Sequence, residues 1–274
     1  MEFHIISDSC CDMPLDLKNS NNIFIVPMSI RMNQSMLADD ELLDMGKFLQ
    51  QMGKVSRITS SPPSPASYLG KIRNDATNFI VTLSNKVSDS FVNALEAKRL
   101  ACKCKVDVHV FDSMSASAGQ MLVTLKLKEL VSAGYDKTRI ISEMNEFIQN
   151  VRTFYVSQNL SHLIKSGRLN RLKGRLLNEL GTRPILGFDG NGDIALYTYA
   201  HSDDQTLNKL IDLIKSSSKT AIENIVITHC NNFDLALRLC GKLEHTVDFK
   251  RIIVAQTRGL NSMYANDQGL IMAF

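Results

Sequence analysis

Short apolar runs alternate with amphipathic stretches along most of the chain. Six apolar runs have the length of buried β-strands: Phe3–Ile6, Ile23–Ile30, Phe79–Leu83, Val106–Phe111, Ile225–Thr228 and Ile252–Ala255. Apolar residues recur at helical spacing in three stretches between the runs: Asp40–Met52, Ser88–Leu100 and Lys137–Val151. Strands separated by helices predict an α/β protein with a largely parallel sheet.

The second half of the chain has a different order of elements. Two short helical stretches are predicted at Ser161–Lys165 and Arg171–Leu180. The segment Asp189-Gly190-Asn191-Gly192 is the strongest hairpin signal, and a strand over Ile194–Tyr199 follows it. A hairpin followed by helix, strand, helix and strand predicts an α+β domain with a mixed sheet. We therefore predict two domains, an N-terminal α/β domain over residues 1–150 and a C-terminal α+β domain over residues 151–274.

Composition narrows the class of protein. The chain has 274 residues, of which 44% are hydrophobic and 22% charged, as is typical of a folded globular protein. Lys and Arg exceed Asp and Glu by 31 − 28 = 3, a scattered excess that does not predict nucleic acid as a partner. No apolar run approaches the length of a transmembrane helix, and the first residues, MEFHIISDSC, lack the features of a secretory signal. We expect a cytoplasmic protein.

The cysteines predict neither a disulfide framework nor a metal site. Six are present: Cys10, Cys11, Cys102, Cys104, Cys230 and Cys240. One adjacent pair and one CxC do not provide the paired CxxC spacing that structural zinc requires. Free thiols are the simplest interpretation, and we expect no metal and no cofactor.

Hydroxyl-rich segments follow three of the N-terminal strands. They are Ser7–Asp12, Ser84–Ser90 and Asp112–Gly119. Ligands of open α/β sheets gather beyond the carboxyl ends of the strands, where these segments are expected to meet. Hydroxyls and helix N-terminal amides suit an anionic oxygen ligand. Helix capping explains each segment taken alone, because Ser and Asp are favoured N-caps.

With these segments the sequence resembles the DegV family, bacterial fatty-acid-binding proteins that present a bound fatty acid to a separate fatty acid kinase. The matching pieces, in family order, are IISDSCCDMP, IFIVPMSI, TSSPPSPASY, LSNKVSDSFVNA, VFDSMSASAGQ, SHLIKSGRLN, RPILGFDGNGDI and GLIMAF. The resemblance spans essentially the whole chain. It implies a two-domain α/β fold, an acyl chain buried between layers and a carboxylate at the surface of the cleft.

The resemblance also implies where the lipid headgroup is bound. The family has a Thr-Ser pair in the loop that is Thr59–Pro65 here, and either Thr59-Ser60 or Ser60-Ser61 takes its place. The family's Ser-Gly-Thr corresponds to Ser88-Asp89-Ser90, with Ser9 and Ser113 as further loop candidates. If Asp89 points inward it repels a carboxylate, and if it points outward it only caps the following helix.

Two departures from the family pattern fall in the second half. His201 takes the place of an Arg of the headgroup network, and Tyr264 takes the place of a His. Arg is always cationic, whereas His is mostly neutral near pH 7, so both changes weaken the expectation of a tightly held carboxylate. The alternative is therefore a degenerate member of the family that binds a different, neutral amphiphile or no lipid.

An enzyme remains the third hypothesis, with Cys10 or a loop serine as nucleophile and His201 or His229 as base. The chain contains neither a G-x-S-x-G elbow nor a Walker A or G-x-G-x-x-G phosphate loop. We therefore expect a protein that is not itself catalytic.

A small group of basic residues follows the first short helix of the second half. Gly167 is placed to end that helix as a C-cap. Arg168, together with Lys173 and Arg175, allows either a basic patch for a partner or a solvated helix face. We favour the solvated face.

Overall fold

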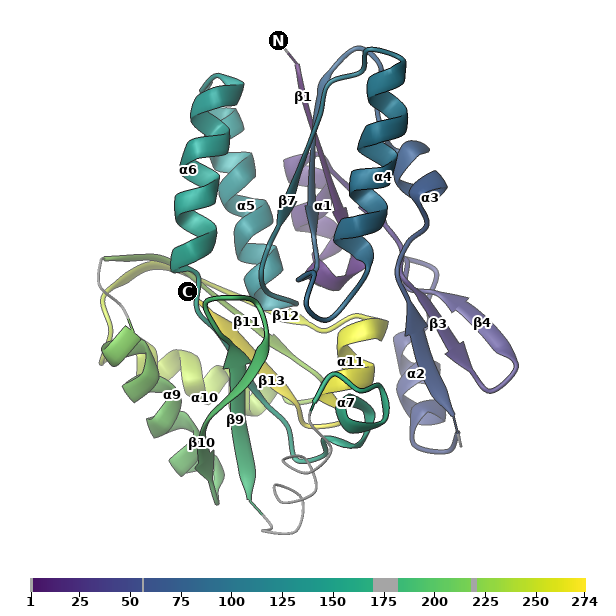
Figure 1. Ribbon diagram of the computed structural model, residues 1–274. Helices are drawn as coiled ribbons and strands as arrows, with labels where there is room; N and C mark the ends of the chain where they lie inside the picture. The colour runs from purple at the N-terminus through teal and green to yellow at the C-terminus, as the bar shows by residue number, and fades with distance from the viewer. Residues whose placement is uncertain (1, 56, 170–181, 218–220) are drawn as a thin grey trace.

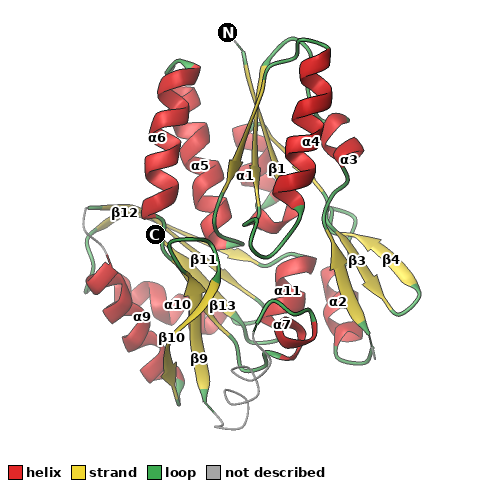
Figure 2. Cartoon of the chain, viewed as in Figure 1, coloured by secondary structure: helices red, strands yellow, loops and turns green. Residues whose placement is uncertain are grey.

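The structure is a computed structural model that describes residues 2–55, 57–169, 182–217 and 221–274. These residues form three β-sheets, of four, six and three strands, with helices packed on them (Figures 1 and 2). This arrangement confirms the predicted α/β class. The predicted helix over Arg171–Leu180 lies outside the described residues.

The N-terminal sheet is wholly parallel, with strand order β2-β1-β6-β7. Its strands are β1 (Phe3–Asp8), β2 (Ile23–Val26), β6 (Thr77–Thr82) and β7 (Val108–Asp112). The helices of this part are the 3-10 turn η1 (Ser9–Cys11), α1 (Leu15–Asn21), α3 (Pro65–Leu69), α4 (Ser90–Lys103), α5 (Ala118–Ser132) and α6 (Lys137–Asn150). The inner strand β6 is buried along its whole length, as expected where helices cover both faces of a sheet.

A small antiparallel sheet projects beside the parallel one (Figure 1). It has the order β4-β3-β5, with β3 (Ser29–Met32), β4 (Ser35–Ala38) and β5 (Ile58–Ser61), and α2 (Met45–Met52) packs on it. The prediction of one strand over Ile23–Ile30 was wrong. Pro27, which has no N–H, separates β2 from β3, and the next amide, that of Met28, donates to Ser9 Oγ at 3.0 Å.

The C-terminal sheet is mixed, as predicted, with the order β10-β9-β8-β13-β11-β12. Its strands are β8 (Thr153–Val156), β9 (Arg183–Phe188), β10 (Ile194–Ala200), β11 (Ile222–His229), β12 (Phe249–Gln256) and β13 (Leu270–Ala273). Only the β11–β12 pair is parallel, and the predicted hairpin joins β9 to β10. The described helices of this part are α7 (Ser161–Lys165), α9 (Asp203–Ser217), α10 (Phe233–Glu244) and α11 (Gly259–Ala265).

Helix α5 holds the two large sheets together. It contacts β1 and β6 of the parallel sheet as well as β11 and β13 of the mixed sheet. Its apolar residues therefore belong to one core shared by both sheets, which explains why nearly every residue of its first two turns is buried. A second core lies between the mixed sheet and α9 and α10, and a third lies between the parallel sheet and α3 and α4.

The element boundaries differ from prediction where side chains cap a helix. The helix predicted from Asp40 begins only at Met45, because Asp44 Oδ1 accepts the amide of Lys47 at 3.0 Å and fixes the N-terminus there. The proposed division of the chain at residue 150 falls between the end of α6 and the start of β8. None of the helices in the described part of the chain has the length and apolarity needed to cross a bilayer.

Candidate functional site

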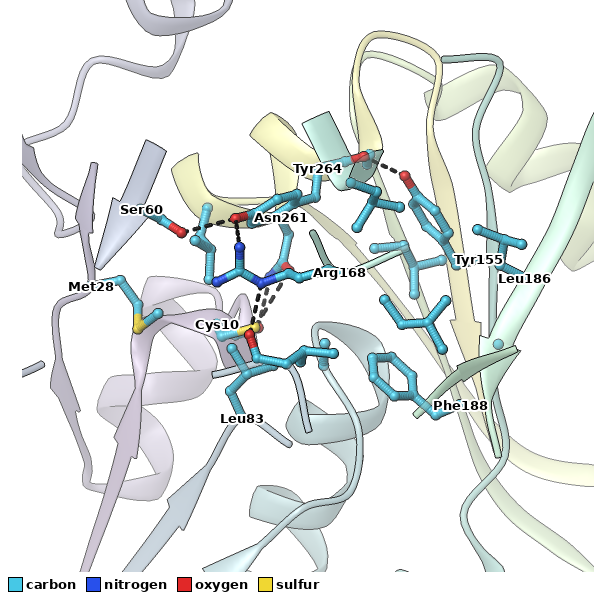
Figure 3. Close-up of a pocket in the computed structure, with 18 residues that line it drawn as sticks. Cys10, Met28, Ser60, Leu83, Tyr155, Arg168, Leu186, Phe188, Asn261 and Tyr264 are labelled. Atoms are coloured by element: carbon cyan, nitrogen blue, oxygen red, sulfur yellow. Dashed lines mark hydrogen bonds between the residues drawn. The ribbon is translucent and has the colours of Figure 1, made fainter. Parts of the chain in front are cut away.

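A mostly apolar cavity lies where the parallel sheet, the small sheet and the mixed sheet meet (Figure 3). Its apolar lining comes from both halves of the chain: Met28, Leu83, Val87 and Ala116 from the first, and Leu163, Leu186, Phe188, Ile194, Leu260 and Ile271 from the second. The cavity volume is about 70 Å³. Small-molecule sites usually enclose roughly 300–1,000 Å³, so a long ligand requires these side chains to move apart.

Three polar side chains meet at one end of this cavity. The Tyr264 hydroxyl lies 3.0 Å from Ser60 Oγ and accepts a hydrogen bond from Arg168 Nη1 at 2.5 Å. The Arg168 guanidinium carbon also lies 4.9 Å from the centre of the Tyr264 ring. Because Arg168 donates to the phenol oxygen, the phenol proton is directed to Ser60 or to an anion in the cavity. The group combines one fixed positive charge with two hydroxyl donors.

The backbone after α7 directs Arg168 into the cavity. Gly167 has a φ of +76°, the left-handed conformation in which glycine ends helices, and the Arg168 amide donates back to Leu163 O at 3.1 Å. The Arg168 side chain then reaches the N-terminal half, where its Nε donates to Val87 O at 2.7 Å. In Figure 3 Arg168 lies between Ser60 on one side of the cavity and Phe188 on the other. The prediction of a solvated face was therefore wrong for this residue; Lys173 and Arg175 lie outside the described residues.

Cys10 and Asn261 complete the polar lining, but their polar atoms are hydrogen-bonded to each other and to neighbouring groups. Asn261 Nδ2 donates to Cys10 O at 2.7 Å and to Asp12 Oδ2 at 2.8 Å, and its Oδ1 lies 3.4 Å from Cys10 Sγ. Burial, together with the charges of Asp8 and Asp12, raises the pKa of the Cys10 thiol well above its usual value. A thiol that stays protonated is a weak nucleophile.

The predicted headgroup residues of the Thr59–Pro65 segment differ in their exposure to solvent. Ser60 is half-buried and lines the cavity, whereas its neighbours Thr59 and Ser61 on β5 are exposed. Successive side chains of a strand point to opposite faces, so Ser60 faces the cavity while its two neighbours face away from it. The structure brings Ser60 and Tyr264 together, and the segment predicted as a loop begins as a strand.

The residues of the second predicted loop lie behind the cavity wall. Ser88 and Ser90 are buried at the start of α4, with their hydroxyls 3.1 Å apart, and Ser90 Oγ donates to the sulfur of Met28, which lines the cavity. Asp89 is exposed and makes no side-chain cap. Its carboxylate therefore does not oppose an anion in the cavity.

His201, Ser9 and Ser113 do not join this group. His201 is exposed just beyond β10, where its amide donates to Gln205 Oε1 at 2.6 Å. Ser9 is buried and donates to Asp39 Oδ2 at 2.9 Å, while Ser113 is buried and donates to Ser115 O at 3.1 Å. The cation of the cavity comes from Arg168 instead of the position that His201 occupies.

Three hydroxyls of the predicted loops join the two halves of the chain. Ser84 Oγ donates to Gly192 O at 2.8 Å. Ser115 Oγ lies 2.7 Å from Thr153 Oγ1, and Ser117 Oγ lies 2.6 Å from Thr228 Oγ1. The loops meet at the carboxyl edge of the parallel sheet, but these hydroxyls are engaged with the mixed sheet and its hairpin rather than with the cavity.

The histidines proposed as bases for an enzyme do not accompany Cys10. Within the described residues, no histidine lines the cavity. His229 is nearly buried at the end of β11, where its Nδ1 accepts the Asn232 amide at 3.3 Å, and burial lowers its pKa. It has the hydrogen-bonded surroundings of a structural histidine.

Comparison with known proteins identifies the family. A family model described as "Uncharacterised protein, DegV family" matches residues 2–265. A DegV domain-containing protein of Streptococcus pyogenes serotype M18 is 26% identical over 279 residues, covering 100% of this chain and 99% of the relative. A DegV domain-containing protein of Streptococcus gordonii is 28% identical with the same coverage, 100% and 99%.

Solved structures have the same fold. A DegV family protein from Ruminococcus gnavus, refined with vaccenic acid, has a TM-score of 0.94 at 28% identity and covers 100% of this chain and 99% of its own. The Streptococcus pneumoniae Fatty Acid Kinase B3 protein loaded with linoleic acid has a TM-score of 0.90 at 26% identity, with coverage of 100% and 99%. The family model spans nearly the whole sequence, and this protein therefore belongs to the DegV family.

Proposed function

We propose that this protein binds a long-chain fatty acid, with the carboxylate held by Ser60, Arg168 and Tyr264 and the hydrocarbon tail along the apolar lining. The observation that carries the proposal is the meeting of one guanidinium and two hydroxyls at one end of an otherwise apolar cavity. Hydrogen bonds to ionised groups are about twice as strong as neutral ones, and Arg is always charged. The site therefore favours a carboxylate over an alcohol.

The tail supplies most of the affinity in this proposal. Burying a chain of about 16 methylenes is worth on the order of 10 kcal/mol at roughly 0.8 kcal/mol for each. Part of this gain is used to separate the lining side chains, since the cavity volume is about 70 Å³. The polar end then orients the ligand and selects its headgroup.

The bound fatty acid is presented to a partner kinase. Support comes from the similar Streptococcus pneumoniae protein, which is described as a Fatty Acid Kinase B3 protein loaded with linoleic acid. A partner must reach the carboxylate from solvent, and Ser60, Arg168 and Tyr264 are each only half-buried, so the polar group is not sealed off. We place this exchange in the cytoplasm, where ATP for a kinase is available.

In this proposal the chain has no catalytic activity of its own. The raised pKa of Cys10 and the separation of His201 and His229 from the cavity support a binding role. The alternative of a neutral amphiphile depended on the loss of a cation and on a carboxylate at Asp89. Arg168 supplies a cation, and Asp89 faces solvent, so the anionic ligand is favoured.

The test is a titration of hexadecanoic acid into the wild type and two matched variants. Arg168→Gln removes the charge, and affinity should fall by roughly 10- to 100-fold, the range for a lost charged hydrogen bond. Lys165→Gln removes an exposed cation of α7 three residues earlier and should leave affinity unchanged. Equal affinity in the wild type and Arg168→Gln would remove the support for a carboxylate at this site.

A further inference from the structure

Two buried carboxylates of the N-terminal half hold the start of α11. Asp39, which is 1% exposed, accepts the amides of Gly259 and Leu260 at 2.8 and 3.2 Å through its two oxygens. Its Oδ2 also accepts the hydroxyl of Ser9 at 2.9 Å. The first amides of a helix have no partner within the helix, so Asp39 satisfies two of those of α11.

Asp12 makes the second attachment and is fully buried. Its oxygens accept the Arg258 amide at 2.6 Å and the Asn261 side-chain amide at 2.8 Å. The same carboxylate accepts the Ser117 hydroxyl at 2.5 Å. Asp12 and Asp39 thus both hold the start of one short helix of the C-terminal half.

Helix α11 is the element that carries Tyr264 to the cavity. Leu260 and Tyr264 are four residues apart, so they lie on the same face of the helix, and both line the cavity. The end of α11 is also tied to the mixed sheet, since the Tyr155 hydroxyl donates to Tyr264 O. Rotation of a seven-residue helix at its start therefore moves the Tyr264 hydroxyl relative to Ser60 and Arg168.

Burial of these carboxylates carries a free-energy cost, which their hydrogen bonds to α11 offset. Within the described residues, no lysine or arginine side chain forms an ion pair or a hydrogen bond with either carboxylate. The guanidinium of Arg258 instead donates to Asp40 O. Buried charges without a paired cation destabilise a fold relative to apolar residues of similar size.

We infer that Asp12 and Asp39 are positioning residues of the headgroup site, which fix α11 so that the Tyr264 hydroxyl meets Ser60 and Arg168. The inference rests on the proposed function, because it concerns the selection of a carboxylate at that site. A purely structural role predicts that a variant weakens all ligands equally. A positioning role predicts that it weakens the acid more than an alcohol with the same tail.

The experiment measures the ratio of affinities for hexadecanoic acid and hexadecan-1-ol. Asp39→Ala should lower the preference for the acid by about tenfold, the effect of losing one or two well-placed hydrogen bonds. Asp39→Asn keeps the oxygen that accepts the Gly259 amide and should retain an intermediate preference. In a Tyr264→Phe background, Asp39→Ala should change the ratio little, because the hydroxyl that it positions is gone.

Asp8 is the matched control. It is equally buried, and its carboxylate accepts from Leu83, Gln120, Cys10 and Tyr68, so its hydrogen bonds in the described part of the chain all stay within the N-terminal half. Asp8→Ala should therefore lower thermal stability without changing the acid-to-alcohol ratio. If the alanine variants do not fold, the same comparison is made between Asp39→Asn and Asp8→Asn.

The outcomes separate this inference from the proposed function. A wild type with no preference for the acid overturns the proposed function itself. A wild type that prefers the acid, with an Asp39→Ala or Asp39→Asn ratio equal to that of the Asp8 variant, overturns the positioning role alone. A selective loss in the Asp39 variants supports it.

Discussion

Ser60 Oγ lies 3.0 Å from the Tyr264 hydroxyl, although 204 residues separate them in the sequence. One residue comes from the small sheet and the other from α11, so the contact joins two elements that lie far apart in the sequence. Arg168 joins the same hydroxyl from a third element. The polar end of the cavity is therefore a product of tertiary structure.

The three groups should act together on ligand affinity. Tyr264→Phe removes the hydroxyl shared by Ser60 and Arg168, and fatty acid affinity should fall by about tenfold. Ser60→Ala should have a similar effect, and the double variant should lose less than the sum, because contacting residues are energetically coupled. Titration of the two single variants and the double variant with hexadecanoic acid measures this coupling. Strict additivity would indicate that the two hydroxyls act independently.

Stability should depend on pH through Asp12. Burial raises the pKa of this carboxyl from its usual 3.8 to about 7, so between these values the folded chain keeps a proton that the unfolded chain has lost. Its contribution to stability is full below about pH 4 and declines as pH rises toward 7. Relative to Asp12→Asn, the wild type should lose about 1.4 kcal/mol of unfolding free energy per pH unit in this window.

Denaturant titrations of both proteins at several pH values measure that difference. The comparison with Asp12→Asn is required because other groups titrate in the same window. Burial lowers the pKa of His109 to about 4, so this side chain takes up a proton on unfolding and contributes a slope of the opposite sign. Parallel curves for the two proteins would contradict the assignment to Asp12.

Two glycines in helices should respond in opposite ways to alanine. A Cβ on Gly119 would lie 2.0 Å from Ser115 Oγ and 2.1 Å from Thr153 Oγ1, where α5 packs on the mixed sheet. Gly119→Ala should therefore destabilise the fold by about 1–3 kcal/mol. Gly241 in α10 has open space around a Cβ, and Gly241→Ala should stabilise by about 0.5–1 kcal/mol. Thermal denaturation distinguishes them, and equal shifts would contradict the close packing at α5.

The apolar lining of the cavity should limit the length of the bound chain. Ile194 lines the cavity at the start of β10, and Ile194→Trp adds volume there. Affinity for octadecanoic acid should fall by roughly tenfold or more, and affinity for dodecanoic acid should fall less. Leu196→Trp, at a partly exposed position of the same strand outside the cavity lining, is the control. Equal losses for both acids would show that the tail does not reach Ile194.

Local patterns were sufficient for most of the framework. Strands β1, β6, β7, β11 and β12, the hairpin at Asp189–Gly192 and the helix end at Gly167 depend on residues close in sequence, and each was predicted, whereas β8 was not. The small sheet was missed because its strands have four residues each and Pro27 interrupts the apolar run that leads into it. The choice between Thr59-Ser60 and Ser60-Ser61 stayed open, since strand alternation is visible only once β5 is known.

Arg168 could not be assigned from its neighbours. It follows a short helix and precedes other basic residues, a setting typical of a solvated surface. Its actual partners are Val87, 81 residues away, and Tyr264, 96 residues away. The glycine before it showed where the helix ends, but only the packing of the two halves decides which way the next side chain points.

The most direct test of the account is native mass spectrometry of the purified protein, followed by solvent extraction and identification of any bound lipid. The account predicts one long-chain fatty acid per chain, with occupancy strongly reduced in Arg168→Gln and retained in Lys165→Gln. A neutral amphiphile in place of the acid, or equal occupancy in wild type and Arg168→Gln, would contradict the claim that this site holds a carboxylate.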